Sequence, residues 1–307
     1  MRSLSPCHPS EVFVSFLFLI SPATLLAVER ANSDLLIFLM TALFAFFLSR
    51  VKTIFSIAAG FVLYFAAALK VYPFILAIPW FFCTKGRTIR SLFLVFGAAM
   101  LSAYFFFFSA ENSYFLKHYP RPLNIDSFGF KILVKLAHLH QSATPLLFMA
   151  VALTAAAMVI GLLQICKSQR VSPTISHLSK LLLFCGVSIL LGCYSLNTNN
   201  PYRLIFFILL LPATFEILRE KKTPKTFRAI LHFAVAFTLV PMFMSELSIR
   251  FVCQTLLHAP NYRWLFCLSN QISFLLSMCI YLSIFALICT KKPLPFQEEA
   301  FSNPPKT

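Results

Sequence analysis

Residues 33–49 read SDLLIFLMTALFAFFLS, a run whose only charge is Asp34 and which ends directly before Arg50. An α-helix of this length is about 25 Å long, close to the ~30 Å of hydrocarbon that a membrane helix must cross. Comparable apolar runs recur along the whole chain, and none shows the period-two alternation of outer-membrane β-strands. The sequence therefore predicts a helical membrane protein.

The same pattern extends outward from this run in both directions. Of the 307 residues, 59% are hydrophobic and 12% are charged, which leaves too little polar surface for a water-soluble domain. We expect an all-α, polytopic fold with about ten transmembrane helices over residues 1–292, an extracytoplasmic loop at about 110–143, and a polar cytoplasmic tail at 293–307. The expected spans lie near 12–28, 33–49, 54–69, 71–83, 91–109, 144–165, 180–195, 202–218, 229–247 and 268–290.

Charge sets the expected orientation of these spans. The net charge is +16, but the 26 Lys and Arg residues are scattered between apolar runs, so we predict no nucleic-acid partner. With the N-terminus in the cytoplasm, most of these residues fall on the cytoplasmic side, as the positive-inside rule requires. We therefore predict that both termini are cytoplasmic. The nine Cys and seven His residues show no spacing typical of metal ligands, so we predict no metal and no cofactor.

Three polar clusters interrupt the apolar pattern, and the expected topology places all of them on the extracytoplasmic side. They are ERANSD at 29–34, KVYP at 70–73 and NTNNPYR at 197–203. Ionisable groups at the ends of spans cost free energy unless they are paired, solvated or used on a substrate. Their position on one side therefore suggests a functional site.

Each cluster also has a purely structural interpretation. Asn32 or Ser33 would cap a helix whose positive end favours Asp34. Lys70 would extend its side chain to the membrane surface before a proline break, and Arg203 would anchor a span at the interface.

Three longer stretches that contain these clusters resemble glycosyltransferase family 87, the polyprenyl-phosphate-dependent hexosyltransferases of the multi-span GT-C group. The first, SPATLLAVERANSDLLIFLMTALFAF at 21–46, is similar to an E-R-G-N-x-D-like block that opens a span in family members. The second, AAGFVLYFAAALKVYPFILAIPWFF at 58–82, looks like A-G-x-x-x-G-x-A-x-x-x-K-x-x-P. The third, NTNNPYRLIFFILLLPA at 197–213, is similar to an Asn-rich loop that leads into Y-R-L-I-F. The chain departs from these blocks at Ala31 and Phe65, where glycine is common in the family.

The resemblance implies transfer of a hexose, mannose-like, from a polyprenyl-phosphate-linked sugar donor to an extracytoplasmic acceptor, among the lipids of a bacterial inner membrane. In such enzymes basic side chains hold the leaving phosphate and a carboxylate removes the acceptor proton. The phosphate-binding residues that the resemblance implies are Lys70, Arg203 and, as a weaker third, Arg30. The implied sugar-site residues are Tyr72, Asn199 and Tyr202, and the implied catalytic carboxylates are Asp34 and Glu29.

Two other functions are compatible with the same residues. Family members have further spans before the first block, including an outer loop with the acidic base, whereas only about 20 residues precede that block here. A chain that lacks this front part would be a non-catalytic accessory protein that binds lipid-linked sugar. Alternatively, the same charges would line the path of a transporter or flippase-like protein.

Overall fold

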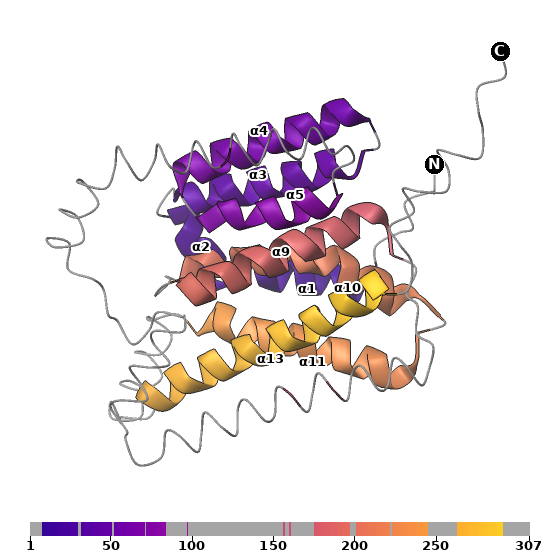
Figure 1. The fold of residues 1–307 in the computed structure, drawn as a ribbon. Helices are drawn as coiled ribbons and strands as arrows, with labels where there is room; N and C mark the ends of the chain where they lie inside the picture. The colour runs from indigo at the N-terminus through magenta and orange to yellow at the C-terminus, as the bar shows by residue number, and fades with distance from the viewer. Residues whose placement is uncertain are drawn as a thin grey trace, which may run out of the picture.

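The computed structural model describes residues 8–29, 32–50, 52–70, 72–83, 175–196, 201–221, 223–244 and 263–290, together with the single residues 97, 156 and 160. Within these ranges the chain is helical and contains no strand (Figure 1). The helices, with η denoting the 3₁₀ type, are α1 (Pro9–Leu19), α2 (Pro22–Glu29), α3 (Ser33–Leu48), α4 (Thr53–Leu69), η1 (Tyr72–Leu76), α5 (Ala77–Cys83), α9 (His177–Leu196), η2 (Pro201–Leu210), α10 (Leu211–Arg219), α11 (Lys225–Phe243) and α13 (Arg263–Thr290).

The all-helical prediction is confirmed over the described ranges. The spans expected at 91–109 and 144–165, the loop at 110–143 and the tail at 293–307 lie outside these ranges. Every other expected span falls on helical structure, with boundaries shifted by a few residues.

Length and apolarity mark the helices that can cross a membrane. Among the described residues three helices meet both criteria, and four do if the bent pair α1 and α2 forms one span. The three are His177–Ser195, Lys225–Phe243 and Phe266–Ile288, whereas α3, α4 and the segment Tyr72–Phe81 are apolar but shorter. The structure thus has the helices of a membrane protein, and the number of about ten spans stays a prediction.

Large apolar side chains point outward from the bundle, as expected for a protein whose solvent is lipid. Phe65 is 66% exposed, Ile54 63% and Phe13 61%. Such exposure would be costly in water but has no penalty in hydrocarbon, where lipid tails are as apolar as these side chains.

The first expected span is not one straight helix. Its two parts, α1 and α2, meet at 51°. Pro22 explains the bend, because proline has no N–H to donate and its ring clashes with the carbonyl four residues earlier, here that of Phe18. The hydroxyls of Ser21 and Thr24 each donate to this Phe18 carbonyl at 2.8 Å, so the freed acceptor is still paired inside the bundle.

Two other expected spans begin with a 3₁₀ segment rather than with α-helix. The segment η1 holds Pro73, and η2 starts at Pro201 and gives way to α10 at Leu211, directly before Pro212. Because proline cannot donate a backbone hydrogen bond, these segments tighten locally instead of forming a regular α-helix.

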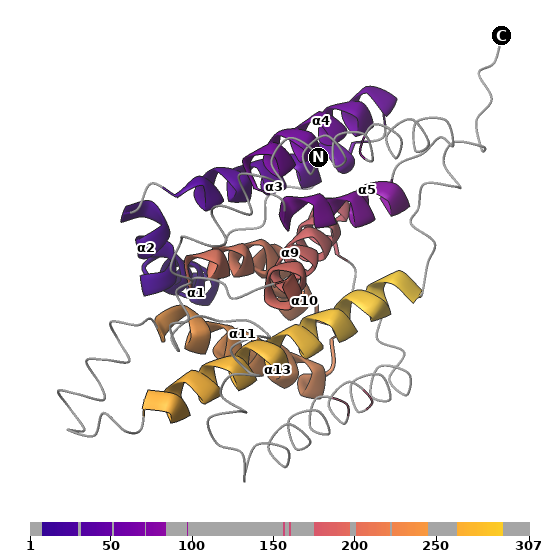
Figure 2. The same ribbon diagram turned by 60° about the vertical axis from the view of Figure 1, so that its left-hand side comes forward.

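The helices form a bundle whose centre is α9, η2 and α10. Figures 1 and 2 show α3, α4 and α5 along one side of this centre and α11 and α13 along the other. The closest neighbours are α3 with α4, α11 with α13, α9 with η2, and α2 with η2. Phe206 and Phe207 of η2 are fully buried and pack into the common core.

At the end of the bundle where α1 begins, polar contacts join α10 to α1 and to the start of α9. Arg219, at the end of α10, forms an ion pair with Glu11 in the first turn of α1. Glu216 accepts hydrogen bonds from the hydroxyls of Ser176 and Ser179, each at 2.8 Å, where α9 begins. Asp34, Lys70 and Arg203, one from each cluster expected to form the site, meet at the opposite end of the bundle. The bundle therefore has two distinct polar ends.

Gly186 of α9 allows this helix to approach η2 closely. A Cβ built on Gly186 would lie 3.1 Å from the Cβ of Leu209 and 3.3 Å from the backbone oxygen of Phe206. Gly186→Ala should therefore lower the free energy of unfolding by about 1–3 kcal/mol, measured by denaturation in detergent.

The matched control is Gly192→Ala in the same helix. A Cβ at Gly192 would meet the end of the flexible Ile75 side chain, which can move aside. Alanine also favours a helix by up to about 1 kcal/mol over glycine, so this variant should lose little or nothing. If both variants lowered the free energy of unfolding equally, the close packing of α9 against η2 at Gly186 would be contradicted.

Candidate functional site

The site begins at the start of α3. Asn32 is the N-cap of this helix, and its side-chain oxygen accepts a hydrogen bond from the backbone N–H of Asp34 at 3.0 Å. The helix start that the sequence predicted is thereby confirmed. Asp34 lies in the first turn, where the positive end of the helix dipole stabilises a carboxylate.

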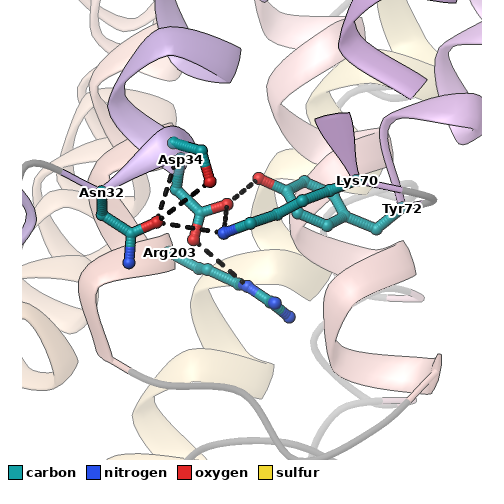
Figure 3. Close-up of polar contacts among 6 residues, drawn as sticks. Asn32, Asp34, Lys70, Tyr72 and Arg203 are labelled. Atoms are coloured by element: carbon teal, nitrogen blue, oxygen red, sulfur yellow. Dashed lines mark hydrogen bonds and ion pairs between the residues drawn. The ribbon is translucent and has the colours of Figure 1, made fainter. Parts of the chain in front are cut away.

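Asp34 is fully buried and is the centre of the site (Figure 3). One of its oxygens, Oδ1, accepts a hydrogen bond from the hydroxyl of Tyr72 at 2.6 Å and lies 2.7 Å from the Nζ of Lys70. Tyr72 belongs to η1 and Lys70 ends α4, so one carboxylate joins three elements.

Lys70 is held by two oxygens. It is the C-cap of α4 and has an extended backbone, which directs the chain away from the helix before η1 begins. Its Nζ donates to the side-chain oxygen of Asn32 at 3.0 Å, in addition to its ion pair with Asp34. The same Nζ lies 5.8 Å from the ring centroid of Tyr202, within the range of a cation–π contact.

Arg203 reaches the same carboxylate from η2. Its Nε lies 3.6 Å from Oδ2 of Asp34, and its guanidinium carbon lies 4.8 Å from the ring centroid of Tyr72. Figure 3 shows the terminal nitrogens of Arg203 on the side of the guanidinium that faces away from Asp34. Arginine stacked in this way keeps its planar fork oriented for an anion.

The structure brings together most of the residues that the sequence singled out. Asp34, Lys70, Tyr72 and Arg203 are in direct contact, and Tyr202 lies beside Lys70.

The remaining predicted residues are not part of this contact network. Glu29, the last residue of α2, is exposed and forms no hydrogen bond or ion pair with the residues that the structure describes. Arg30 and Asn199 lie outside the described residues.

One member of the site was not predicted from the sequence in this role. Asn32 was expected only as a helix cap, but its oxygen also holds Lys70, which lies 38 residues further along the chain. The available signal was its position in the E-R-x-N-x-D pattern, two residues before the buried carboxylate. In the described part of the chain no group of three or more His, Cys, Asp or Glu side chains is arranged to hold a metal ion.

The electrostatics of the arrangement favour an anionic ligand. The carboxylate is fully buried, whereas the side chains of Lys70 and Arg203 are 23% and 21% exposed. The three charged groups sum formally to +1, with the negative charge inside and the positive charges nearer the surface. A phosphate approaching this end of the bundle would therefore meet two cations and no exposed carboxylate among these three residues.

The fold and the site together define a helical membrane protein with two cations gathered on a buried carboxylate at one end of the bundle. The chain belongs to glycosyltransferase family 87, because the model of this family matches residues 4–191. The matched range contains Asp34, Lys70 and Tyr72, and Arg203 lies beyond it. No curated protein and no solved structure was found to match the chain. Family membership confirms the resemblance and makes the protein a membrane glycosyltransferase by family.

The contact between Tyr72 and Asp34 can be tested by its effect on stability. Tyr72→Phe removes the hydroxyl that donates to the buried carboxylate. Because a hydrogen bond to a charged group contributes about 1.5–3 kcal/mol, we expect a loss of this size in the free energy of unfolding.

Tyr194→Phe is the matched control, because the Tyr194 hydroxyl is buried without a hydrogen-bond partner in the described structure. Removing it should leave stability unchanged or raise it, since an unpaired buried hydroxyl is unfavourable. A loss at Tyr194 as large as at Tyr72 would contradict the assigned contact.

Proposed function

We propose that the protein transfers a hexose, mannose-like, from a polyprenyl-phosphate-linked sugar to an acceptor on the extracytoplasmic side of the membrane. Family membership supports glycosyl transfer in a membrane. The observation that carries the finer proposal is the pairing of Lys70 and Arg203 on one buried carboxylate at one end of the bundle. Two converging cations are the arrangement that a leaving phosphate requires.

Lys70 and Arg203 have complementary roles in this proposal. Arginine binds phosphate oxygens through a bidentate fork, whereas lysine acts as a point charge. Both side chains are partly exposed, so a lipid-linked phosphate at the membrane surface can reach them while its hydrocarbon tail stays among the lipids. Arg30 is proposed as a third, auxiliary cation.

The sugar site is proposed beside these cations. The rings of Tyr72 and Tyr202 lie next to Arg203 and Lys70 respectively, where they can flank a sugar attached to the bound phosphate. Asn199 is proposed to complete this site with hydrogen bonds to sugar hydroxyls.

Of the two carboxylates implied as catalytic, Glu29 has the exposure that a general base needs. Both end up at the same end of the bundle, because α2 ends at Glu29 and α3 begins close after it at Ser33. Glu29 is exposed, whereas Asp34 is buried beneath its three partners. We therefore assign proton removal from the acceptor hydroxyl to Glu29.

Replacing the two cations separately tests the proposed phosphate site. Lys70→Ala and Arg203→Ala should each lower transfer from a polyprenyl-phosphate sugar by at least about 100-fold, because each removes stabilisation of the leaving phosphate. Transfer is measured with the full chain in membranes and normalised to the amount of inserted protein.

In the same assay Glu29→Gln should lower kcat and leave the KM for the donor unchanged.

Lys52→Ala is the control for a loss of positive charge, because Lys52 is exposed and caps the opposite end of α4. Its transfer rate should equal that of the wild type. Unchanged turnover in both Lys70→Ala and Arg203→Ala would refute the phosphate site. Donor binding without any turnover in the wild type would instead indicate the accessory function.

The proposed orientation places the site outside and both termini in the cytoplasm of a bacterial inner membrane. Alkaline phosphatase is active only after export, so fusions after Arg50 and after Lys221 should be inactive, because these positions follow the cytoplasmic ends of α3 and α10. A fusion after Lys70 should be active. Active fusions after Arg50 and Lys221 would mean that the site faces the cytoplasm.

A further inference from the structure

We infer that Asp34 is the internal counter-ion of the phosphate site and that it weakens the hold of Lys70 and Arg203 on the product phosphate, so that the product can leave. The inference rests on the proposed function, since it concerns the same cations and the same lipid-linked ligand. It assigns to Asp34 a role different from proton transfer to or from the acceptor.

The position of Asp34 supports this role. Its side chain has no exposed surface, and its two oxygens face Lys70, Tyr72 and Arg203. An acceptor hydroxyl has no route to such a carboxylate without displacing these side chains. The negative charge still acts on both cations, because the carboxylate lies 2.7 Å from the Nζ of Lys70 and 3.6 Å from the Nε of the Arg203 guanidinium.

The charge of the ligand changes during transfer. In the donor the phosphate is a diester with one negative charge. Attack by the acceptor oxygen on the anomeric carbon forms the new glycosidic bond and breaks the bond from that carbon to the phosphate oxygen. The electron pair of the broken bond stays on the phosphate, and the acceptor proton goes to the base. The product phosphate is therefore a monoester with a charge of about −1.5 to −2 at neutral pH.

The formal charge of the three side chains matches the donor better than the product. Lys70, Arg203 and Asp34 together carry +1, and the formal charges of Arg30 and Glu29 cancel each other. The site therefore balances the diester but leaves the monoester with excess negative charge. Without Asp34 the two cations would balance the dianionic product and hold it firmly. The buried carboxylate thus favours exchange of product for a new donor.

Asp34→Asn is the sharpest probe because it removes the charge while keeping an oxygen to which Tyr72 and Lys70 can donate. We expect the Kd of the purified full-length protein in nanodiscs for a polyprenyl monophosphate to fall by about tenfold or more. Structural damage would weaken binding, so tighter binding is a result that a merely structural role does not produce. Glu29→Gln is the control and should leave this Kd unchanged, because an exposed charge is screened.

Each other outcome overturns the inference or the proposed function, and the two are distinguishable. An unchanged Kd in Asp34→Asn together with lost turnover would make Asp34 the base. A higher Kd would make it a purely structural residue. If the wild type does not bind the monophosphate at all, or if Lys70→Ala and Arg203→Ala bind it as the wild type does, the proposed phosphate site itself fails.

A measurement on the wild type keeps the inference testable even if Asp34→Asn does not fold. The polyprenyl monophosphate is compared with its methyl diester, which carries a single negative charge like the donor. A site with a net charge of +1 should bind the two with Kd values within about threefold of each other. A preference of tenfold or more for the monoester would show that Asp34 does not offset the cations.

Discussion

The ion pair between Asp34 and Lys70 is the interaction on which the arrangement of the site depends. The carboxylate of Asp34 has no exposed surface, so water does not solvate its charge, and removing one partner of such a buried pair costs about 3–5 kcal/mol. The start of α3 and the end of α4 must therefore lie together. Arg203 brings the start of η2 to the same carboxylate, although it lies far from both helices in the sequence. One buried charge thus fixes three chain segments at one end of the bundle.

Breaks in regular helix place these residues at that end. Asn32 is the N-cap of α3, and Lys70 is the extended C-cap that ends α4. Arg203 is the third residue of η2, which begins at Pro201. Each of these polar groups therefore lies where a described helix starts or ends, outside the apolar middle of that helix. At the opposite end, the ion pair between Glu11 and Arg219 likewise lies at the ends of its two helices.

Much of this arrangement follows from the sequence, because it depends on hydrophobicity and on local capping. The apolar helices, a helix cap at Asn32 or Ser33 and the position of the three polar clusters on one side were all predicted. The bend at Pro22 and the second role of Asn32 were not, because both depend on which groups from distant segments meet. The same holds for the different burial of Asp34 and Glu29, since two carboxylates five residues apart look equivalent in the sequence until the packing separates them.

We propose that this family 87 glycosyltransferase uses two cations near the surface and a carboxylate beneath them, so that one compact charge cluster sets the binding and release of a lipid-linked phosphate. The most direct measurement is an experimental structure of the protein in nanodiscs with a bound polyprenyl monophosphate. We expect the phosphate within hydrogen-bonding distance of Lys70 and Arg203, on the side facing away from Asp34, with the Asp34–Lys70 contact present. A phosphate bound elsewhere, or Lys70 and Arg203 far apart, would contradict this account.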